Sequence, residues 1–413
     1  MIPHVATTSE LPATTTRPID PGAGRVFRVL FISIFAATLG LGIISPLMPI
    51  YAESLGATGI WLGLIFSGFS LARLIFMPIV GRLSDRIGRK VFIVVGLVLY
   101  TVISLLYVWA SDVVQLTLVR LFHGFASAMV IPIAMAYVGD TTPKGREGTR
   151  LGTFNIALFL GMGSGPFLGG VLNDALGMKA VFYSMALLTA FAFLTSLLFL
   201  PKSTTNPARK ARQRTPLREI IRNRVVKALL LFRAINAVAR GGILAFLPLL
   251  AVRFGLNTTQ LGVLLSANVL LTAALQRPFG VVADKMNRYV LVALGSVVTS
   301  FGLVAVPFMR SFLSFLLLSL AIGGGGAVAM PAATAITAEI GQWAGMGTSM
   351  GLFNMAMSVG MILAPLISGA VMDLLGLEAV FFVAGAIGFA GTALFYLLVR
   401  DLFARHSASP GPT

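Results

Sequence analysis

Gly81-Arg82-Leu83-Ser84-Asp85-Arg86-Ile87-Gly88-Arg89-Lys90 is a dense charged segment between two apolar runs, and each run is long enough to cross a lipid bilayer. A weaker copy begins 199 residues later, with the sequence Gly280-Val281-Val282-Ala283-Asp284-Lys285-Met286-Asn287-Arg288-Tyr289. A shared offset of this kind indicates an internal repeat. At the same offset, 20 of the 56 positions in 128–183 are identical to those in 327–382. The chain is therefore a fused duplicate of one unit.

Composition places the chain in a membrane. Hydrophobic residues make up 57% of the sequence, charged residues only 11%, and the mean hydropathy is +0.92. A soluble protein of 413 residues would lack the polar residues needed to cover its surface. The sequence has no cysteine, which excludes disulfides and thiolate metal sites, and it has only three histidines. We therefore expect no metal and no cofactor, and no phosphate-binding loop motif is present to bind ATP.

Apolar runs of suitable length follow one another along the chain, six in each copy. They predict an all-α membrane protein with twelve transmembrane helices in two pseudo-symmetric six-helix bundles. The predicted spans are 26–51, 60–80, 91–110, 115–138, 150–172, 179–200, 225–252, 259–280, 290–309, 313–337, 348–371 and 379–399. The predicted segments are a disordered cytoplasmic tail (1–25), an N-terminal bundle (26–200), a basic cytoplasmic linker (201–224), a C-terminal bundle (225–399) and a cytoplasmic tail (400–413).

The distribution of basic residues predicts the orientation. The tails, the linker and the loops and span ends on their side carry 23 lysines and arginines, whereas the opposite side carries only Lys179, Arg253 and Arg310. Because cytoplasmic loops are enriched in basic residues, both termini are predicted to be cytoplasmic. We expect a multi-pass protein of a bacterial cytoplasmic membrane.

Two six-helix copies joined by a basic linker, with this charged decapeptide between the second and third spans, resemble the major facilitator superfamily. The resemblance covers Val26 to Arg400 and implies that family's fold. It also implies that the decapeptide and its copy form a cytoplasmic gate that latches the two halves together. The alternative is that the decapeptide is a basic cytoplasmic turn that only sets the orientation of the chain in the membrane. The implied gate residues are Gly81, Asp85, Arg86, Gly88, Arg89, Asp284 and Arg288.

Two further elements narrow the resemblance to the twelve-span drug:proton antiporters. In the fourth span, Arg120 and Gly124 fit an R-x-x-x-G element found in proton-coupled members, so Arg120 and the nearby His123 are candidates for proton coupling. In the fifth span, 161–170 fits the G-x-x-x-G-P-x-x-G-G element of antiporters. Glycines at every fourth position allow a neighbouring helix to approach closely. The predicted helix-packing hinge comprises Gly161, Gly165, Pro166, Gly169, Gly170 and Pro365 of the second copy.

Charges inside the spans depart from the pattern of the cation exporters in that group. The first span contains no carboxylate, and the acidic residues outside the tails and linker lie in loops or near span ends. Arginines, which are costly in hydrocarbon, instead lie within spans, and none is duplicated at the offset of 199: Arg73, Arg120, Arg233, Arg240 and Arg277. These arginines could instead have a structural role, by pairing with acidic residues at span ends or by extending their charged groups to the membrane interface.

Because the scaffold repeats and these charges do not, we expect the charges to serve something asymmetric, such as a substrate. Arg233, Asn236 and Arg240 share one face of the seventh span by their spacing. We therefore predict that substrate binds to these three residues and to Arg73, midway between the repeats.

The function that these features favour is secondary active transport by alternating access, and no enzymatic activity is expected. The resemblance implies a proton-coupled exporter of small amphipathic drug-like compounds. The arginines favour the alternative, a transporter or flippase of an anionic or zwitterionic amphiphile, and a non-transporting receptor is a third hypothesis. The expected partners are a small-molecule substrate, the lipid bilayer and a proton gradient. We expect a monomer and no nucleic-acid partner.

Overall fold

The computed structural model describes residues 21–142, 147–201 and 217–405, and within these ranges the regular structure is helical, without strands. Twelve of the described helices are long and apolar enough to cross a membrane. The predicted fold class is therefore confirmed. A membrane span must satisfy its backbone hydrogen bonds internally, and a helix does so. The apolar side chains of these helices either pack against neighbouring helices or remain exposed on the outside.

The described residues of the first half form seven helices: α1 (Pro21–Ile44), α2 (Met48–Ser54), α3 (Gly59–Ile87), α4 (Arg89–Trp109), α5 (Val113–Asp140), α6 (Glu147–Leu176) and α7 (Met178–Phe199). The second half begins with a short helix, α8 (Leu217–Arg222), and then repeats the arrangement of the first half. Its further elements are α9 (Arg224–Arg253), α10 (Thr258–Lys285), α11 (Arg288–Ala305), the 3₁₀ turn η1 (Val306–Phe308), α12 (Phe312–Ala344), α13 (Met346–Leu375) and α14 (Leu377–Arg405).

The structure differs from the predicted spans at the start of the chain. The single span expected over 26–51 is two helices, because α1 ends at Ile44 and α2 begins at Met48. Pro46 and Pro49 lack the N–H that a continuous helix would need there, so the chain turns. α1 also begins at Pro21, inside the segment expected to be a tail.

The segment expected to be a linker is partly helical. α8 lies within it and buries Ile220 against α9. Residues 202–216 of that segment lie outside the described ranges, as do residues 1–20 and 406–413 of the two tails.

The charged decapeptide forms the end of α3 and the start of α4. Gly88 separates the two helices with φ of +115°, a conformation that side chains with a Cβ rarely adopt. In the second half the equivalent position is Asn287, which keeps a negative φ and instead accepts hydrogen bonds from Tyr289 N and Val290 N at the start of α11. The two turns therefore use different residues to begin a new helix at the same place.

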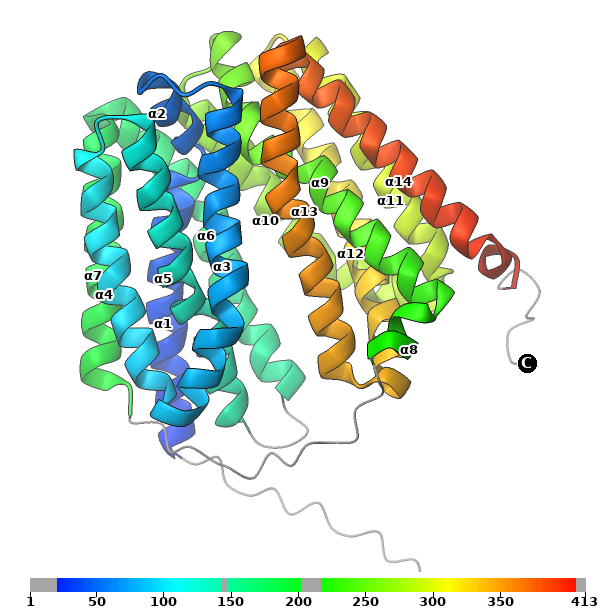
Figure 1. Ribbon diagram of the computed structural model, residues 1–413, viewed down its shortest axis with the longest axis horizontal. Helices are drawn as coiled ribbons and strands as arrows, with labels where there is room; N and C mark the ends of the chain where they lie inside the picture. The colour runs from blue at the N-terminus through cyan, green and yellow to red at the C-terminus, as the bar shows by residue number, and fades with distance from the viewer. Residues whose placement is uncertain (1–20, 143–146, 202–216, 406–413) are drawn as a thin grey trace, which may run out of the picture.

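The two halves lean together at one end and diverge at the other (Figure 1). They touch through α3 on α13 and α6 on α10. The end that carries the loops between α1 and α3 and between α9 and α10 is called the closed end below. The end that carries the charged decapeptide, α8 and the C-terminus of α14 is called the open end.

Candidate functional site

The seventh span, α9, brings two arginines into the second half. Arg233 is half-buried, and its terminal nitrogens donate to the thioether sulfurs of Met330 (2.9 Å) on α12 and Met357 (2.6 Å) on α13. Its Cζ lies 4.7 Å from the centroid of the Phe353 ring, a cation–π distance. Thioethers and a ring are weak partners for a guanidinium, so its charge is not neutralised.

Arg240 lies two turns further along the same face of α9, and its guanidinium rests against the backbone of Gly326 on α12. It forms no ion pair or hydrogen bond with any residue that the structure describes. Arg233 and Arg240 interact electrostatically as like charges. The spacing on α9 therefore does bring these two arginines together, as the sequence predicts, and half-buried Asn236 lies between them along the helix.

Arg73 does not join this group. It lies on α3 and interacts with Tyr100 of α4, inside the first half. The structure thus places two of the predicted substrate arginines on α9 with Asn236, and the third on α3 in the first half. Arg277, on α10, is exposed.

Arg73 belongs to a polar cluster within the first half, built from α3, α4 and α5. The Tyr107 hydroxyl and Nδ1 of His123 are 2.9 Å apart, and the His123 ring meets the rings of Phe69, Tyr100 and Tyr107 edge to face. Arg120 lies over Phe66 and Phe69, with its Cζ 5.2 and 4.8 Å from the ring centroids. Residues 120 and 123 are therefore both buried and near each other.

The closed end is held by two carboxylates that cap helices of the opposite half. Asp373, at the end of α13, accepts hydrogen bonds from Gly59 N (2.7 Å) and Ile60 N (2.8 Å) at the start of α3. A carboxylate at a helix N-terminus satisfies free amides and interacts favourably with the helix dipole.

Asp174, at the end of α6, does the same for α10. It accepts from Thr258 N (3.3 Å) and Thr259 N (2.8 Å), and from both threonine hydroxyls at 2.5 and 2.6 Å. Asp174 and Asp373 are 199 residues apart, as are Gly59 and Thr258. The closed end therefore carries two pseudo-symmetric clamps between the halves.

The open end shows a second pair of matched interactions, each within one half. Arg89 binds Asp85, Asp140 (3.0 Å) and the Ser84 hydroxyl (2.7 Å). Arg288 binds Asp284 (3.4 Å) and Glu339, the residues at the same offset. Among the described residues, no hydrogen bond or ion pair joins the halves here. In this conformation the predicted gate residues therefore do not latch the halves, and Arg86 is exposed.

The predicted glycine strip packs within the first half. A Cβ at Gly161, Gly165 or Gly169 would collide with the backbone or side chains of α1. Pro166 and Gly170 instead face the other half, where the Pro166 carbonyl lies against Gly262 and Gly170 against Thr258. Pro365 makes the equivalent contact with Gly63.

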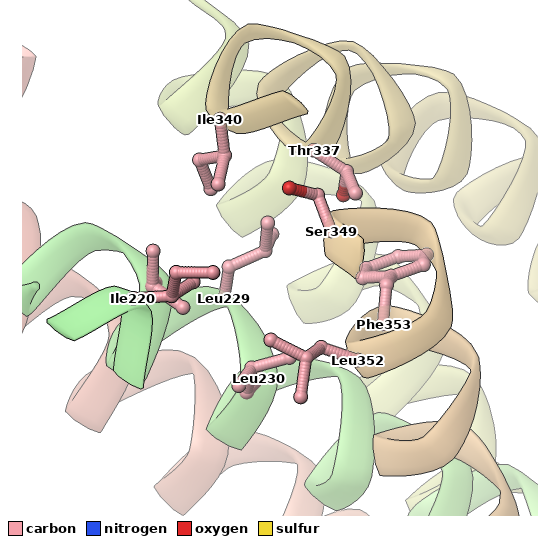
Figure 2. Close-up of a pocket in the computed structure, with 9 residues that line it drawn as sticks. Ile220, Leu229, Leu230, Thr337, Ile340, Ser349, Leu352 and Phe353 are labelled. Carbon is pink, nitrogen blue, oxygen red and sulfur yellow. The ribbon is translucent and has the colours of Figure 1, made fainter. Parts of the chain in front are cut away.

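A small apolar pocket lies near the open end of the second half, among α8, α9, α12 and α13 (Figure 2). Among the described residues that line it, only Thr337 and Ser349 have polar side chains, so it does not suit a charged group. Phe353 lines this pocket and also carries Arg233 on its ring. The remaining lining residues are aliphatic: Ile220, Val226, Leu229, Leu230, Ile340 and Leu352.

The sequence profile of the Major Facilitator Superfamily matches residues 30–235 and 229–412 of this chain, nearly the whole of both halves. The chain belongs to the major facilitator superfamily. An uncharacterised transporter of this superfamily from Methanocaldococcus jannaschii, MJ1560, is 34% identical over 84% of this chain and 92% of that protein. The quinolone resistance protein NorA of Staphylococcus aureus is 26% identical over 89% of this chain and 94% of that protein.

Solved structures of the superfamily share the fold. A bacterial homologue of the human lysosomal transporter Spinster, inward-facing and unoccupied, has a TM-score of 0.78 at 14% identity, covering 95% of this chain and all of the other. The human organic anion transporter MFSD10 has a TM-score of 0.64 at 20% identity, covering 91% of this chain and all of the other. This superfamily member is an integral multi-pass membrane transporter and not an enzyme.

Sequence reasoning named Arg73, Arg120 and His123 but missed the clamps and the hydroxyl-bearing residues packed around these three. The signal for the clamps was present, because Asp174 and Asp373 are identical at the repeat offset. The signal for Tyr100, Tyr107 and Ser127 was absent, because hydroxyl side chains in apolar helices are common and spacing does not say which helices meet.

Proposed function

We propose that this superfamily member exports small amphipathic organic compounds by alternating access, and that the compounds carry an anionic or zwitterionic group. The observation that carries the proposal is the pair Arg233 and Arg240, two like charges without a carboxylate partner among the described residues. An anion between two guanidiniums is attracted to both, whereas a cation is repelled.

The amphipathic character follows from the surroundings of Arg233. Its aromatic support, Phe353, also lines the apolar pocket, so a compound with its charged group at Arg233 has an apolar wall beside it. A site with a few placed polar groups and an apolar lining is usual for small organic ligands. Export of drug-like compounds is supported by the likeness to the quinolone resistance protein NorA, and an anionic cargo by the shared fold with MFSD10, an organic anion transporter.

Proton coupling, both termini in the cytoplasm and a bacterial cytoplasmic membrane are further parts of the proposal. They rest on the elements at 120–124 and 161–170 and on the bias of basic residues toward the open end. With that orientation the open end faces the cytoplasm. The membrane potential also favours outward movement of a monoanion, by about 2.3 kcal/mol per 100 mV.

Transport into proteoliposomes tests the proposal, with anionic, zwitterionic and cationic amphiphiles built on one skeleton. We expect flux of the anionic or zwitterionic compound, strong loss in Arg240→Gln and partial retention in Arg240→Lys, which keeps the charge but not the planar fork. Arg277→Gln is the matched control, because Arg277 is exposed and outside the site. Flux of the cation that is unchanged in Arg233→Gln and Arg240→Gln would favour export of cationic drugs instead.

Imposed gradients separate the driving forces in the same vesicles. Under the proposal, a pH gradient alone drives uptake in the wild type. If a membrane potential alone gives the full rate and a pH gradient gives none, the proton-coupled part of the proposal is contradicted.

A further inference from the structure

The polar cluster of the first half contains buried polar atoms without partners. Among the described residues, Nε of Arg73, Nε of Arg120, Nε2 of His123, the Tyr100 hydroxyl and the Ser127 hydroxyl are buried and form no hydrogen bond. Buried polar atoms are almost always paired, with protein or with ordered solvent, because an unpaired one has lost its hydrogen bonds to water without replacing them. Five such atoms on three adjoining helices indicate that something else binds there.

The five atoms belong to one site. Arg73 and Arg120 both act electrostatically on the Tyr100 hydroxyl, and Arg120 acts on Tyr107 and His123. The Tyr100 and Ser127 hydroxyls lie close together without meeting hydrogen-bond geometry. The ring centroids of Tyr100 and His123 are 4.8 Å apart. The unpartnered groups therefore converge between α3, α4 and α5.

The chemistry of these groups selects the ligand. A guanidinium Nε only donates, and hydroxyls can donate, so donors dominate the set. If the Tyr107 hydroxyl donates to Nδ1 of His123, then Nε2 carries a proton and donates as well. No described carboxylate pairs with Arg73 or Arg120. Water would occupy some of these donors but would not neutralise two guanidiniums in a low-dielectric interior.

We propose that this cluster, formed by Arg73, Tyr100, Arg120, His123 and Ser127, binds one small monovalent anion of halide or carboxylate size. The site is separate from Arg233 and Arg240, which lie in the other half. The aromatic rings around it leave little room for a bulky ion, and their edges carry partial positive charge. A free inorganic anion and the carboxylate of an organic anion share this chemistry.

Anion binding to the purified full chain tests the site without reference to transport. The protein is exchanged into gluconate at constant ionic strength and titrated with chloride, bromide, nitrate or formate, while the unfolding midpoint and equilibrium binding of radioactive chloride are measured. We expect saturable binding of one chloride per chain and a midpoint that rises with occupancy. Gluconate is the reference anion, because its polyhydroxylated chain does not suit aromatic surroundings.

Variants assign the binding to the cluster. Arg120→Gln and Arg73→Gln should abolish saturable chloride binding, and Arg277→Gln should leave it unchanged. Tyr100→Phe and Ser127→Ala each remove one donor and no volume of consequence, so they should fold and bind chloride about 3- to 10-fold more weakly. Absence of saturable binding in the wild type, or equal binding in all of these variants, would overturn the proposal.

Two further arms identify the source of the anion and keep this site distinct from the transport site. Displacement of chloride by formate but not by octanoate identifies a free small anion, and displacement by octanoate as well identifies the head of an amphiphile. Either outcome supports the site. Arg233→Gln should retain chloride binding even where it abolishes transport, so the two proposals fail separately.

Discussion

At the scale of single residues, Gly326 decides whether Arg240 can occupy its place. A Cβ at this position would overlap the Arg240 guanidinium. Gly326→Ala should therefore displace Arg240 and lower the affinity for the transported anion nearly as much as Arg240→Gln does. Gly324→Ala is the control, because nothing lies within 4 Å of its added Cβ. The measurement is the affinity of each variant for the anionic amphiphile. Equal affinities of Gly326→Ala and Gly324→Ala would show that Arg240 does not bind the amphiphile.

Asp174 and Asp373 are the residues that hold the closed end. Asp373→Asn keeps the shape but removes the charge that faces the start of α3, so we expect about 0.5–2 kcal/mol less stabilisation of the closed end. The double variant with Asp174→Asn should lose about twice as much, because the clamps are separate. Distances between spin labels at Ser54 and Glu378, in this cysteine-free chain, should broaden toward longer values.

Glu53→Gln provides the control for the clamp variants. Glu53 lies 3.7 Å from Arg253 across the same end, but both side chains are largely exposed, and such pairs contribute little. If Glu53→Gln opens the closed end as much as Asp373→Asn, then general charge at this end, and not capping of α3, holds the halves together.

At the scale of helices, the contact of α6 with α1 tolerates no side chain at its centre. A Cβ at Gly165 would lie 2.5 Å from Cα of Gly42, which is backbone and cannot rotate away. Gly165→Ala should thus destabilise the protein by about 1–3 kcal/mol, and Gly165→Leu by more. Gly152→Ala, in the same helix with open space around it, should be neutral or slightly stabilising. Thermal unfolding of the three variants measures the difference.

The helices themselves were predictable because length, hydropathy and repeated glycines all point to the same spans. Their partners were less predictable. The spacing of Arg233 and Arg240 places them on one face of α9, and a face is a property of a single helix. Whether Arg73 turns toward the other half or toward Tyr100 depends on how α3 packs, and the sequence of α3 alone does not specify that. The break between α1 and α2 could have been read from Pro46 and Pro49.

At the scale of the whole molecule, the orientation in the membrane is open to a direct test. Single cysteines at Ser54, in the closed end, and at Gln342, in the open end, are both exposed in this otherwise cysteine-free chain. If the termini are cytoplasmic, an impermeant thiol reagent outside intact cells should label position 54 and should label position 342 only after permeabilisation. The reverse pattern would show that the open end faces outward.

The two halves are alike in the polar contacts at their ends and unlike in the charges within their spans. The clamps and the triads around Arg89 and Arg288 occur twice, whereas each intramembrane arginine occurs once. The duplicated contacts give the two halves equivalent interactions at both ends, whereas the unduplicated arginines make the interiors of the two halves differ in charge. Because the contacts that shape the fold are repeated and the intramembrane arginines are not, the repeat offset predicts the architecture well and the candidate site poorly.

Each clamp at the closed end accepts from two backbone amides, to which the Asp174 clamp adds two threonine hydroxyls, and this affects how the gene can vary. Any residue except proline supplies a backbone N–H, so α3 and α10 can begin with different residues, Gly59-Ile60 in one half and Thr258-Thr259 in the other, and keep the same bond. Gly59 is held for another reason, because a Cβ there would meet the carbonyl of Gly369. Homologous sequences compared at the Asp373 contact would therefore show drift at Ile60 and a retained aspartate opposite it, so a search for paired substitutions would overlook this contact.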